Sequence, residues 1–307
     1  MRDLSIVVPT HDTRELTLRC LRSLAFLADE GAQVVLVDDG SRDGTEAAVR
    51  DAWSGVEVLR NERAQGFSRA ANRGLAAARG RLLLLLNSDT ELDASVARAL
   101  EAFRADERLG AAGAALVGPD GAAQWSGGRL PTRAWLLAMA SGLPSLLGAL
   151  PGYRRLRPPG AAPADAEWVT GAALVIRREA WDEVGPLSEA FAFYGQDLDF
   201  CQRLRERGWR VRLVADWRVV HVGGATIGRR PGSVSGVQLE LLWADLLRWA
   251  RRHHGDAWAA RTARLMSAAV TARLTARALA RPLAADRERW DRDSAALRSA
   301  RETLSPS

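Results

Sequence analysis

A chain of 307 residues is long enough for one large or two modest domains with a sizeable core. Its hydrophobic content of 47% and charged content of 26% are those of a globular protein and exclude a disordered chain. The formal charge is +6, and because the sequence holds no lysine, all 43 basic residues are arginine. Segment 248–281 contains eight of them and one acid, Asp256, so its net charge is +7 and the remainder sums to −1. This basic tail predicts an anionic partner, either a membrane or a polyanion.

Cysteine content and hydropathy bear on the compartment. The two cysteines, Cys20 and Cys201, both lie in helical patterns, which predicts no disulfide framework and favours a reducing compartment. The N-terminus enters a strand at once, without the apolar region of a signal peptide. The longest uncharged stretch, 134–153, holds five glycines and prolines, which favour a loop or an interfacial segment over a membrane span. We therefore expect a cytoplasmic protein.

The first 120 or so residues alternate between strand and helix patterns, which is typical of βαβ units in a parallel sheet. The pattern predicts strands at 4–9, 34–37, 56–59, 82–86 and 111–117, and helices at 15–27, 43–53, 68–78 and 94–103. Residues 118–167, rich in glycine, proline and alanine, are interpreted as an insert over the sheet. Regular structure is then expected as a strand at 168–176, helices at 178–184 and 197–207, and a strand at 209–214.

Beyond residue 236 the pattern is wholly helical. One helix has an apolar face formed by Leu239, Leu242, Leu246 and Trp249. A longer helix is predicted at 258–280 and ends before a proline. Its weak apolar stripe consists of Trp258, Leu265, Ala272 and Leu279. Three arginines are predicted to point away from this stripe: Arg273, Arg277 and Arg281.

The most informative motif is a run of five leucines followed by Asn87, Ser88 and Asp89. A run of this kind predicts a strand buried on both faces, and open α/β sheets bind ligands at the carboxyl ends of such strands. The amide and carboxylate oxygens suit a hard divalent cation. The alternative is that the triplet forms a turn or caps the helix at 94–103.

Two other acidic motifs are candidates for the same site. Asp38 and Asp39 follow an apolar run, where a carboxylate could accept hydrogen bonds from a base or ribose; alternatively they form a turn or cap the next helix. Asp197 and Asp199 begin a helix, where one could be a general base or both could simply favour the helix dipole. Residues two apart on a helix point in different directions, so Asp199 is interpreted as the structural acid.

Two further segments leave alternatives open. His221 ends an apolar run before two glycines and could complete a metal site, although a lone histidine is more often structural. The stretch 65–74 (QGFSRAANRG) runs from a loop into a helix, where backbone amides with Arg69 or Arg73 could bind phosphate; the alternative is a solvated helix face.

Taken together and in order, these motifs resemble those of the inverting glycosyltransferases of family 2, which have the GT-A fold. The resemblance spans residues 4 to about 225 and includes 6–11 (IVVPTH), 37–41 (VDDGS), 65–67 with Asn72, 86–89 (LNSD), 170–172 with Arg177, 196–197 and His221. The segment 244–254 (ADLLRWARRHH) resembles the helix that follows the catalytic domain in the rhamnosyltransferase-like branch.

The resemblance implies an α/β GT-A domain at 1–228, with a Rossmann-like, mostly parallel central sheet and flanking helices. Its nucleotide-binding half would be about 1–117, the insert 118–167 and the acceptor-side half 168–228. A basic helical C-terminal extension would occupy 229–307.

The resemblance also implies roles for individual residues. Asp197 would be the catalytic base, and Asp89 and His221 would hold Mg²⁺ or Mn²⁺ on the donor diphosphate. The nucleotide-sugar-binding residues would be Pro9, Thr10, Asp38, Asp39, Gly66, Asn72, Asn87 and Ser88. Two departures weaken the match: Asn87 and Ser88 stand where relatives often have Asp or Pro, which favours weaker metal binding, and Gln196 replaces the usual Glu beside the base.

The activity implied is metal-dependent transfer of a sugar, rhamnose in this branch, from a nucleotide-diphosphate donor to an acceptor hydroxyl with inversion. The acceptor would be a glycan or lipid-linked glycan in bacterial cell-surface polysaccharide synthesis, bound near the insert. Segment 248–281 would contact the cytoplasmic face of the membrane, and no nucleic acid partner is expected. The alternative is a catalytically silent GT-A-like domain that binds nucleotide sugars or partners. A sugar-nucleotide pyrophosphorylase is disfavoured because no glycine- and arginine-rich loop follows the first strand.

Overall fold

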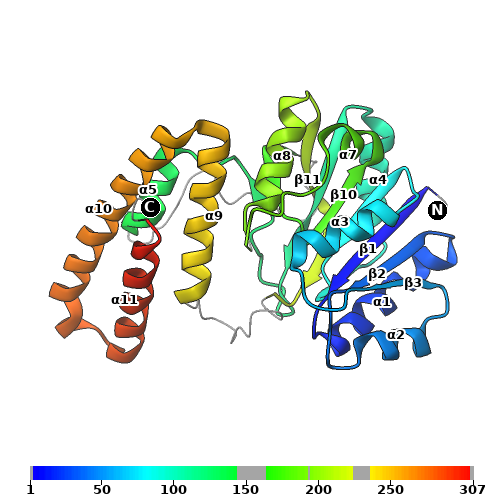
Figure 1. Cartoon of the computed structure of the whole chain (residues 1–307), viewed down its shortest axis with the longest axis horizontal. Helices are drawn as coiled ribbons and strands as arrows, with labels where there is room; N and C mark the ends of the chain where they lie inside the picture. The colour runs from blue at the N-terminus through cyan, green and yellow to red at the C-terminus, as the bar shows by residue number, and fades with distance from the viewer. Residues whose placement is uncertain (1–2, 144–163, 193, 224–235, 305–307) are drawn as a thin grey trace. The chain divides into compact units, whose positions relative to one another are not determined.

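The computed structural model describes residues 3–143, 164–192, 194–223 and 236–304 (Figure 1). The chain divides into two compact units. The first contains residues 1–130, 152–189 and 196–228, and the second contains 131–151, 190–195 and 229–307. Part of the predicted insert, residues 131–151, and a short loop before Gln196 group with the C-terminal helices.

The first unit is built on a mostly parallel sheet with the strand order β3-β2-β1-β4-β10-β6-β11-β5 and with β8 paired to β11. Strands β1 to β4 are parallel to one another, β6 is parallel to β11, and β10 is antiparallel to both of its neighbours, β4 and β6. In the described residues these strands are β1 (Leu4–Thr10), β2 (Gln33–Asp38), β3 (Val56–Arg60), β4 (Leu82–Leu86), β5 (Thr90–Glu91), β6 (Leu109–Val117), β8 (Ala164–Ala166), β10 (Ala173–Arg177) and β11 (Arg210–His221). A separate small sheet pairs β7 (Gly127–Gly128) with β9 (Trp168–Val169).

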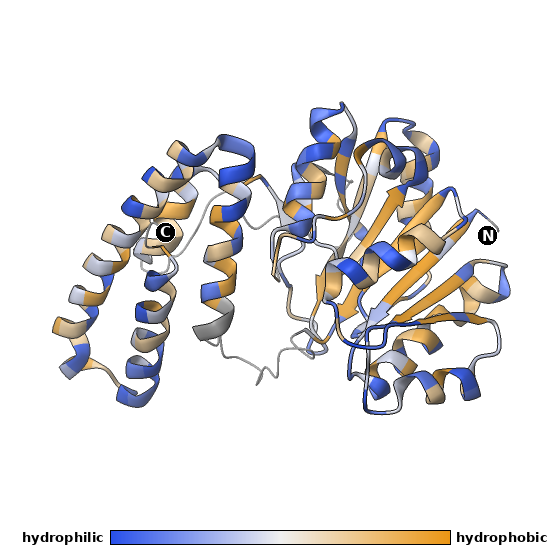
Figure 2. Cartoon of the chain, in the orientation of Figure 1, coloured by the Kyte–Doolittle hydropathy of each residue, from blue (hydrophilic) through white to orange (hydrophobic). Residues whose placement is uncertain are grey.

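Helices follow the parallel strands, as the alternating pattern predicted. They are α1 (Arg14–Asp29), α2 (Thr45–Ala52), α3 (Phe67–Ala77), α4 (Val96–Ala105), α7 (Arg178–Val184) and α8 (Gln196–Glu206). The central strands form the apolar core of this unit (Figure 2), and the side chains of Ile6, Leu36 and Leu84 are fully buried on adjacent strands. Burying a leucine or isoleucine side chain stabilises the fold by about 1.5–3 kcal/mol, so the leucine run anchors the centre of the sheet.

A glycine sets how closely α3 approaches the sheet. A Cβ atom at Gly74 would overlap the side chains of Val7 on β1 and Val37 on β2. Because Gly74 has no side chain, α3 can lie directly on these two strands. The N-terminus of α3 then reaches the edge where β1 and β2 end.

Three predictions about elements are corrected. The predicted strand at 168–176 is two strands, β9 and β10, separated by residues 170–172. Strand β11 runs seven residues beyond its predicted end at Val214. A register shift between Val214 and Arg218 leaves the residues between them out of the ladder, and pairing with β6 then resumes. The predicted insert holds a helix, α5 (Arg133–Ser141), whose N-terminus is capped by the side chain of Thr132.

The second unit is helical, consisting of α5, α9 (Gly236–His254), α10 (Asp256–Ala280), a 3₁₀ turn at Arg281–Leu283 and α11 (Arg287–Glu302). Helix α9 contributes a buried face that includes Trp243, Leu246 and Trp249, and it packs against α10 and α11. Two of the four residues predicted for this face, Leu246 and Trp249, are fully buried.

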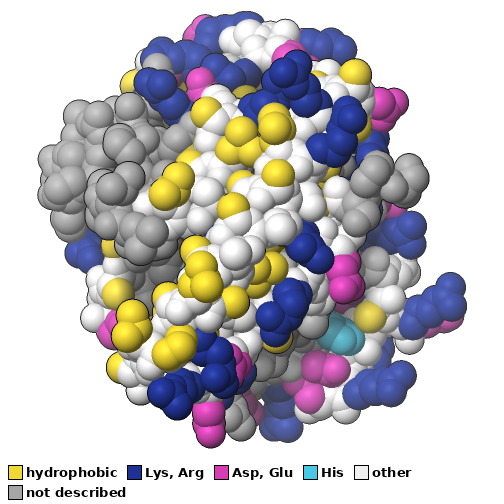
Figure 3. Space-filling model, turned by 90° about the vertical axis from the view of Figure 1, so that its left-hand side faces the viewer, with side chains coloured by type: hydrophobic (Ala, Val, Ile, Leu, Met, Phe, Trp, Pro, Cys, Tyr) yellow, Lys and Arg dark blue, Asp and Glu magenta, His cyan; other side chains and the backbone are white. Residues whose placement is uncertain are grey.

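The apolar stripe predicted for α10, which includes Leu265 and Leu279, is not the buried face of this helix. Leu265 is 42% exposed and Leu279 is 79% exposed, whereas Met266 and Val270 are buried. The large apolar side chains of this helix are few, so small residues fill the contacts with α5, α9 and α11 and the leucines are left outside. Figure 3 shows apolar side chains gathered down the middle of one face with arginine side chains around them.

Candidate functional site at the carboxyl ends of the central strands

The sequence-predicted site residues converge on one edge of the sheet. Strands β1 and β2 are paired in register so that Thr10 lies beside Asp38, and the Asp39 backbone N–H donates to the Thr10 carbonyl at 2.8 Å. Strand β4 ends at the same edge next to β1, immediately before Asn87. The carboxyl ends of parallel strands therefore bring three separate motifs together, as α/β sheets do at ligand sites.

The carboxylates of Asp38 and Asp39 both hold the surrounding loops. Asp38 is fully buried, accepts from the Ser41 N–H at 2.7 Å, and forms an ion pair with Arg60 at 2.5 Å. Asp39 accepts from the Asn61 side chain at 2.6 Å and from backbone N–H groups at the start of α3, those of Gln65 at 2.9 Å and Gly66 at 2.8 Å.

Because those amides donate to Asp39, the loop that could have bound phosphate is tied to the end of β2. Gly40 supports the same contact, since its positive φ of 75° and its lack of a Cβ let residues Arg63 and Ala64 pass directly against the turn. The structure thus uses Gly66 and both aspartates to shape the edge of the site.

A network of hydroxyl groups lies behind this edge. The Thr10 hydroxyl lies 2.7 Å from that of Thr17 and 2.9 Å from that of Thr13, and Thr13 in turn lies 2.9 Å from the Ser88 hydroxyl. All four residues are buried, as is Pro9 on β1. Thr10 and Ser88 therefore direct their side chains toward α1 and fix the ends of β1 and β4 relative to each other.

Asn72 on α3 has a different environment from the one its motif implied. Its side-chain amide donates to the Leu187 carbonyl and accepts from the Leu187 N–H, both at 2.9 Å. Both ends of the amide are therefore used to fasten the loop after α7 to α3.

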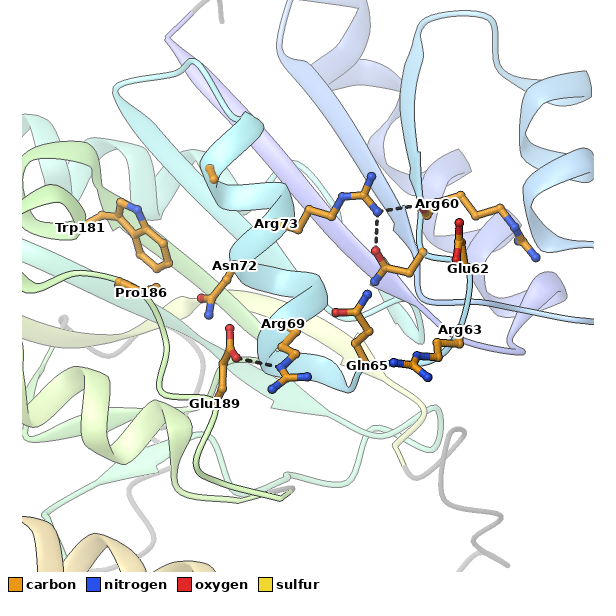
Figure 4. A pocket seen from close by; sticks show the side chains of 12 residues that line it. Arg60, Glu62, Arg63, Gln65, Arg69, Asn72, Arg73, Trp181, Pro186 and Glu189 are labelled. Atoms are coloured by element: carbon orange, nitrogen blue, oxygen red, sulfur yellow. Dashed lines mark hydrogen bonds and ion pairs between the residues drawn. The ribbon is translucent and has the colours of Figure 1, made fainter.

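The same part of α3 borders an open pocket of about 950 Å³ (Figure 4). The close-up shows Arg69 directed at Glu189, at 2.8 Å. Arg73 donates to the Asn61 side chain and to the Arg60 carbonyl. None of Asp89, Asp197 and His221 lines this pocket, so it lies outside the centre that the acidic motifs define.

Asp89 and His221 meet, as the sequence predicted. His221 ends β11, which pairs antiparallel with β5 just after Asp89, and its Nε2 atom lies 3.3 Å from an Asp89 carboxylate oxygen. The other Asp89 oxygen accepts from the Gly223 N–H at 3.1 Å. The second imidazole nitrogen, Nδ1, lies 2.8 Å from the side-chain oxygen of Gln124.

The two acids of α8 have separate environments. Asp199 is fully buried and paired with Arg203 at 2.9 Å, and that guanidinium also donates to the carbonyls of Val184 and Pro186. Asp199 therefore has the environment expected of a structural acid. Asp197 is partly exposed, and its carboxylate accepts from the N–H groups of Leu198 at 2.9 Å and Gly171 at 3.3 Å.

Burial raises the pKa of Asp197 above its ordinary value, and the two backbone hydrogen bonds only partly oppose this. A carboxylate with a raised pKa and an exposed edge is suited to accept a proton from a hydroxyl group. It is also linked to the end of β4, because the residue after Gly171, Ala172, accepts a hydrogen bond from the Asn87 N–H at 2.9 Å.

Two polar atoms at this edge stay buried without a hydrogen-bond partner among the described residues: the side-chain oxygens of Asn87 and Gln196. Both belong to the motifs that depart from the family pattern. An unpaired buried oxygen costs free energy, and a bound ion or ligand is one way to supply its missing partner.

Sequence reasoning missed Gln124, which contacts His221 from a turn after β6, and Asp245 on α9. Asp245 is fully buried and accepts from the N–H groups of Ala192 at 3.1 Å and Tyr194 at 2.8 Å, in the loop before α8. A buried carboxylate must have a hydrogen-bond partner, but the sequence does not reveal that this partner lies 51 residues away at Tyr194.

The fold and the acidic residues at the strand ends define a GT-A-type glycosyltransferase domain. The family model for glycosyl transferase family 2 matches residues 5–157, and that for glycosyl transferase family group 2 matches residues 155–285. The chain belongs to glycosyl transferase family 2.

Relatives and solved structures agree with this assignment. The chain is 28% identical over 251 residues to an N-acetylglucosaminyl-diphospho-decaprenol L-rhamnosyltransferase of Mycobacterium tuberculosis, covering 75% of this chain and 79% of that protein. A mannosyltransferase from Pyrobaculum calidifontis, solved with GDP-Man and Mn²⁺, superposes with a TM-score of 0.62 at 17% identity, over 98% of this chain and 86% of that one. TarS of S. aureus with UDP-GlcNAc superposes with a TM-score of 0.54 at 15% identity, over 99% and 82% of the two chains.

Proposed function

We propose that the protein transfers a single sugar, rhamnose, from a nucleotide-diphosphate donor to an acceptor hydroxyl with inversion at the anomeric carbon. The observation that carries this is the environment of Asp197, a partly exposed carboxylate of raised pKa held at the end of β4. The identity of the sugar is supported by the name of the mycobacterial relative, an L-rhamnosyltransferase.

In this mechanism Asp197 takes the proton of the acceptor hydroxyl as its oxygen bonds to the anomeric carbon. The bond from that carbon to the diphosphate breaks on the opposite face, which inverts its configuration. The fixed position of Asp197, held by two backbone N–H groups, keeps the base in one orientation for this attack.

The residues present fit a divalent cation at Asp89 and His221. Their ligand atoms lie 3.3 Å apart, close enough to share one ion, and the unpaired side-chain oxygen of Asn87 adds an oxygen donor near the end of the same strand. Among the described residues no group of three histidine, cysteine or acidic side chains gathers around one point. Mg²⁺ and Mn²⁺ sites that use few protein ligands complete their shells with water and substrate phosphate. When bound, such an ion would neutralise the charge of the departing diphosphate.

The acceptor we propose is a lipid-linked glycan in bacterial cell-surface polysaccharide synthesis, in line with the substrate named for the mycobacterial relative. No helix within the described ranges is both long and apolar enough to cross a membrane. We propose peripheral contact through α10, whose exposed face carries Leu265 and Leu279 alongside Arg261 and Arg264.

The test is a panel of nucleotide-diphosphate sugars, rhamnose donors included, incubated with an N-acetylglucosaminyl-diphospho-lipid acceptor and analysed by mass spectrometry. A product heavier by one deoxyhexose, with the opposite anomeric configuration from the donor, is expected. Binding of donors with neither transfer nor hydrolysis across the panel would instead favour a catalytically silent domain.

A further inference from the structure

Gln124 contacts His221 through both ends of its side-chain amide. Its side-chain nitrogen donates to the His221 backbone carbonyl at 2.7 Å, and its side-chain oxygen lies 2.8 Å from the ring nitrogen Nδ1. A carbonyl only accepts hydrogen bonds, so the first contact fixes which end of the amide is the nitrogen. The oxygen must then face the imidazole, and an oxygen there can only accept.

The proton on the ring follows from this arrangement. Because the Gln124 oxygen accepts, Nδ1 of His221 must carry the hydrogen. In the neutral ring the other nitrogen, Nε2, then carries no hydrogen, and its lone pair faces an Asp89 carboxylate oxygen at 3.3 Å. Two acceptors facing each other at this distance call for a positive charge between them.

Gln124 is itself held firmly. Its backbone N–H donates to the Leu116 carbonyl at 2.9 Å, and the turn before it is closed by a bond from the Gly118 N–H to the Ala122 carbonyl at 2.7 Å. Gly223 lies near the ring, where a Cβ atom would make ordinary van der Waals contact with the imidazole at 3.7 Å. The amide therefore presents a fixed acceptor to His221.

We propose that Gln124 is a positioning residue that locks His221 in the Nδ1–H tautomer, so that Nε2 and Asp89 together present two ligand atoms to a divalent cation. The inference rests on the proposed metal site. Outer-shell partners of a metal-bound histidine act in this way by fixing the tautomer and ring orientation.

The tautomer can be read directly in the unaltered protein. In ¹⁵N-labelled protein at alkaline pH without metal, long-range ¹H–¹⁵N spectra are expected to show a protonated Nδ1 and an unprotonated Nε2 for His221, identified by its loss in His221→Ala. A protonated Nε2, alone or together with Nδ1, would overturn the proposal.

Variants then connect the tautomer to metal affinity. Gln124→Met keeps the length of the side chain but removes the acceptor, so His221 should populate both tautomers and Mn²⁺ affinity by calorimetry should fall about 10- to 100-fold. Gln124→Glu retains an acceptor for Nδ1–H but loses the bond to the His221 carbonyl, so it should keep the tautomer and more of the affinity than Gln124→Met does. Gln202→Met on α8 removes an amide whose nitrogen donates to Glu206 at 3.0 Å, and it is the matched control.

Failure of the inference can be told apart from failure of the metal site. If Asp89→Asn and His221→Ala abolish Mn²⁺ binding while Gln124→Met leaves both affinity and tautomer unchanged, the site stands and the role of Gln124 is wrong. If neither ligand variant alters Mn²⁺ binding, the proposed metal site is wrong, and the tautomer spectra still decide what Gln124 does.

Discussion

At the scale of single residues, Asp197 and Asp199 show how two acids in one helical turn take different tasks. Asp197→Asn keeps the shape of the side chain but cannot accept a proton, so turnover should fall about 10²-fold or more while nucleotide binding changes little. The measurement is initial rate together with donor affinity. Asp199→Asn is the matched variant: it should lower stability by leaving Arg203 without its partner, and turnover per folded molecule should hold. Loss of turnover in folded Asp199→Asn, with Asp197→Asn active, would reverse the assignment.

The raised pKa of Asp197 predicts a pH dependence. The acidic limb of kcat/KM should lie above the range of an ordinary aspartate, because the base must be ionised to act. The effect on stability has a definite sign. A carboxyl whose folded pKa is raised favours folding below its unfolded pKa, and this contribution is lost as pH rises through the folded pKa. Asp197→Asn should therefore gain thermal stability over the wild type as pH rises through that window and show no gain below it.

Asp89 and His221 predict dependence on a divalent cation. Activity should vanish with chelator and return on adding Mg²⁺ or Mn²⁺, since the two residues would hold the ion on the donor diphosphate. Rates measured across an EDTA titration and metal add-back check this. Full activity in excess EDTA would remove the metal from the mechanism.

Motif reasoning at this scale found the chemistry but not the partners. Asp89 and His221 could be paired in advance because both follow apolar strands that end at one edge. The partners of Asn72, Asp39 and His221 could not, since Leu187 and Gln124 lie in loops whose path depends on the whole fold. The sequence accordingly predicted ligand-facing roles for Asn72 and Asp39, whereas their polar atoms hold Leu187 and the start of α3.

At the scale of elements, the alternating apolar pattern was sufficient to predict β1 to β4 and their helices, because each strand is a short buried run between turns. It failed where a strand contains polar residues. β11 carries Asp216 and Arg218 within a paired segment, and only the bulge between Val214 and Arg218 reconciles them with the sheet. A bulge of this kind leaves no periodic signal.

Asp245 gives an element-scale prediction, because one side chain of α9 holds the loop before α8. Asp245→Ala leaves the N–H groups of Ala192 and Tyr194 without their acceptor. Because Ala192 is exposed and Tyr194 is only partly buried, water can replace the carboxylate, so each lost hydrogen bond costs about 0.5–1.5 kcal/mol. Amide hydrogen exchange at these two residues should accelerate. Asp256→Ala, which removes an 88% exposed acid at the start of α10, is the control and should leave their exchange unchanged. Unaltered exchange in Asp245→Ala would show that the loop is held by other contacts.

At the scale of the whole molecule, several arginines of segment 248–281 are engaged in contacts inside the second unit. Four of its eight arginines make contacts within the second unit: Arg248 pairs with Asp245, Arg251 with Asp256 and Arg281 with Asp291, and Arg277 lies over the Trp290 ring. Asp291 and Trp290 belong to α11, beyond residue 281. Residues 282–307 hold as many arginines as acids, so the net charge of +7 stays the same when they are added, and these contacts limit only which arginines can reach a partner.

The remaining prediction concerns the exposed face of α10. Arg261 and Arg264 are exposed beside Leu265, so they are the arginines best placed to meet an anionic surface while the leucines enter its interface. Each arginine near such a surface contributes about 1 kcal/mol, so replacing both with glutamine should weaken partitioning to anionic vesicles roughly 30-fold. Arg281→Gln is the matched control, because Arg281 is already paired with Asp291 at 2.6 Å and should contribute less. Co-sedimentation at low and high salt measures both, and binding should decline as salt shortens the range of the attraction. Equal pelleting with neutral and anionic vesicles would show that charge does not hold the protein there, and the leucines would then be the groups to replace next.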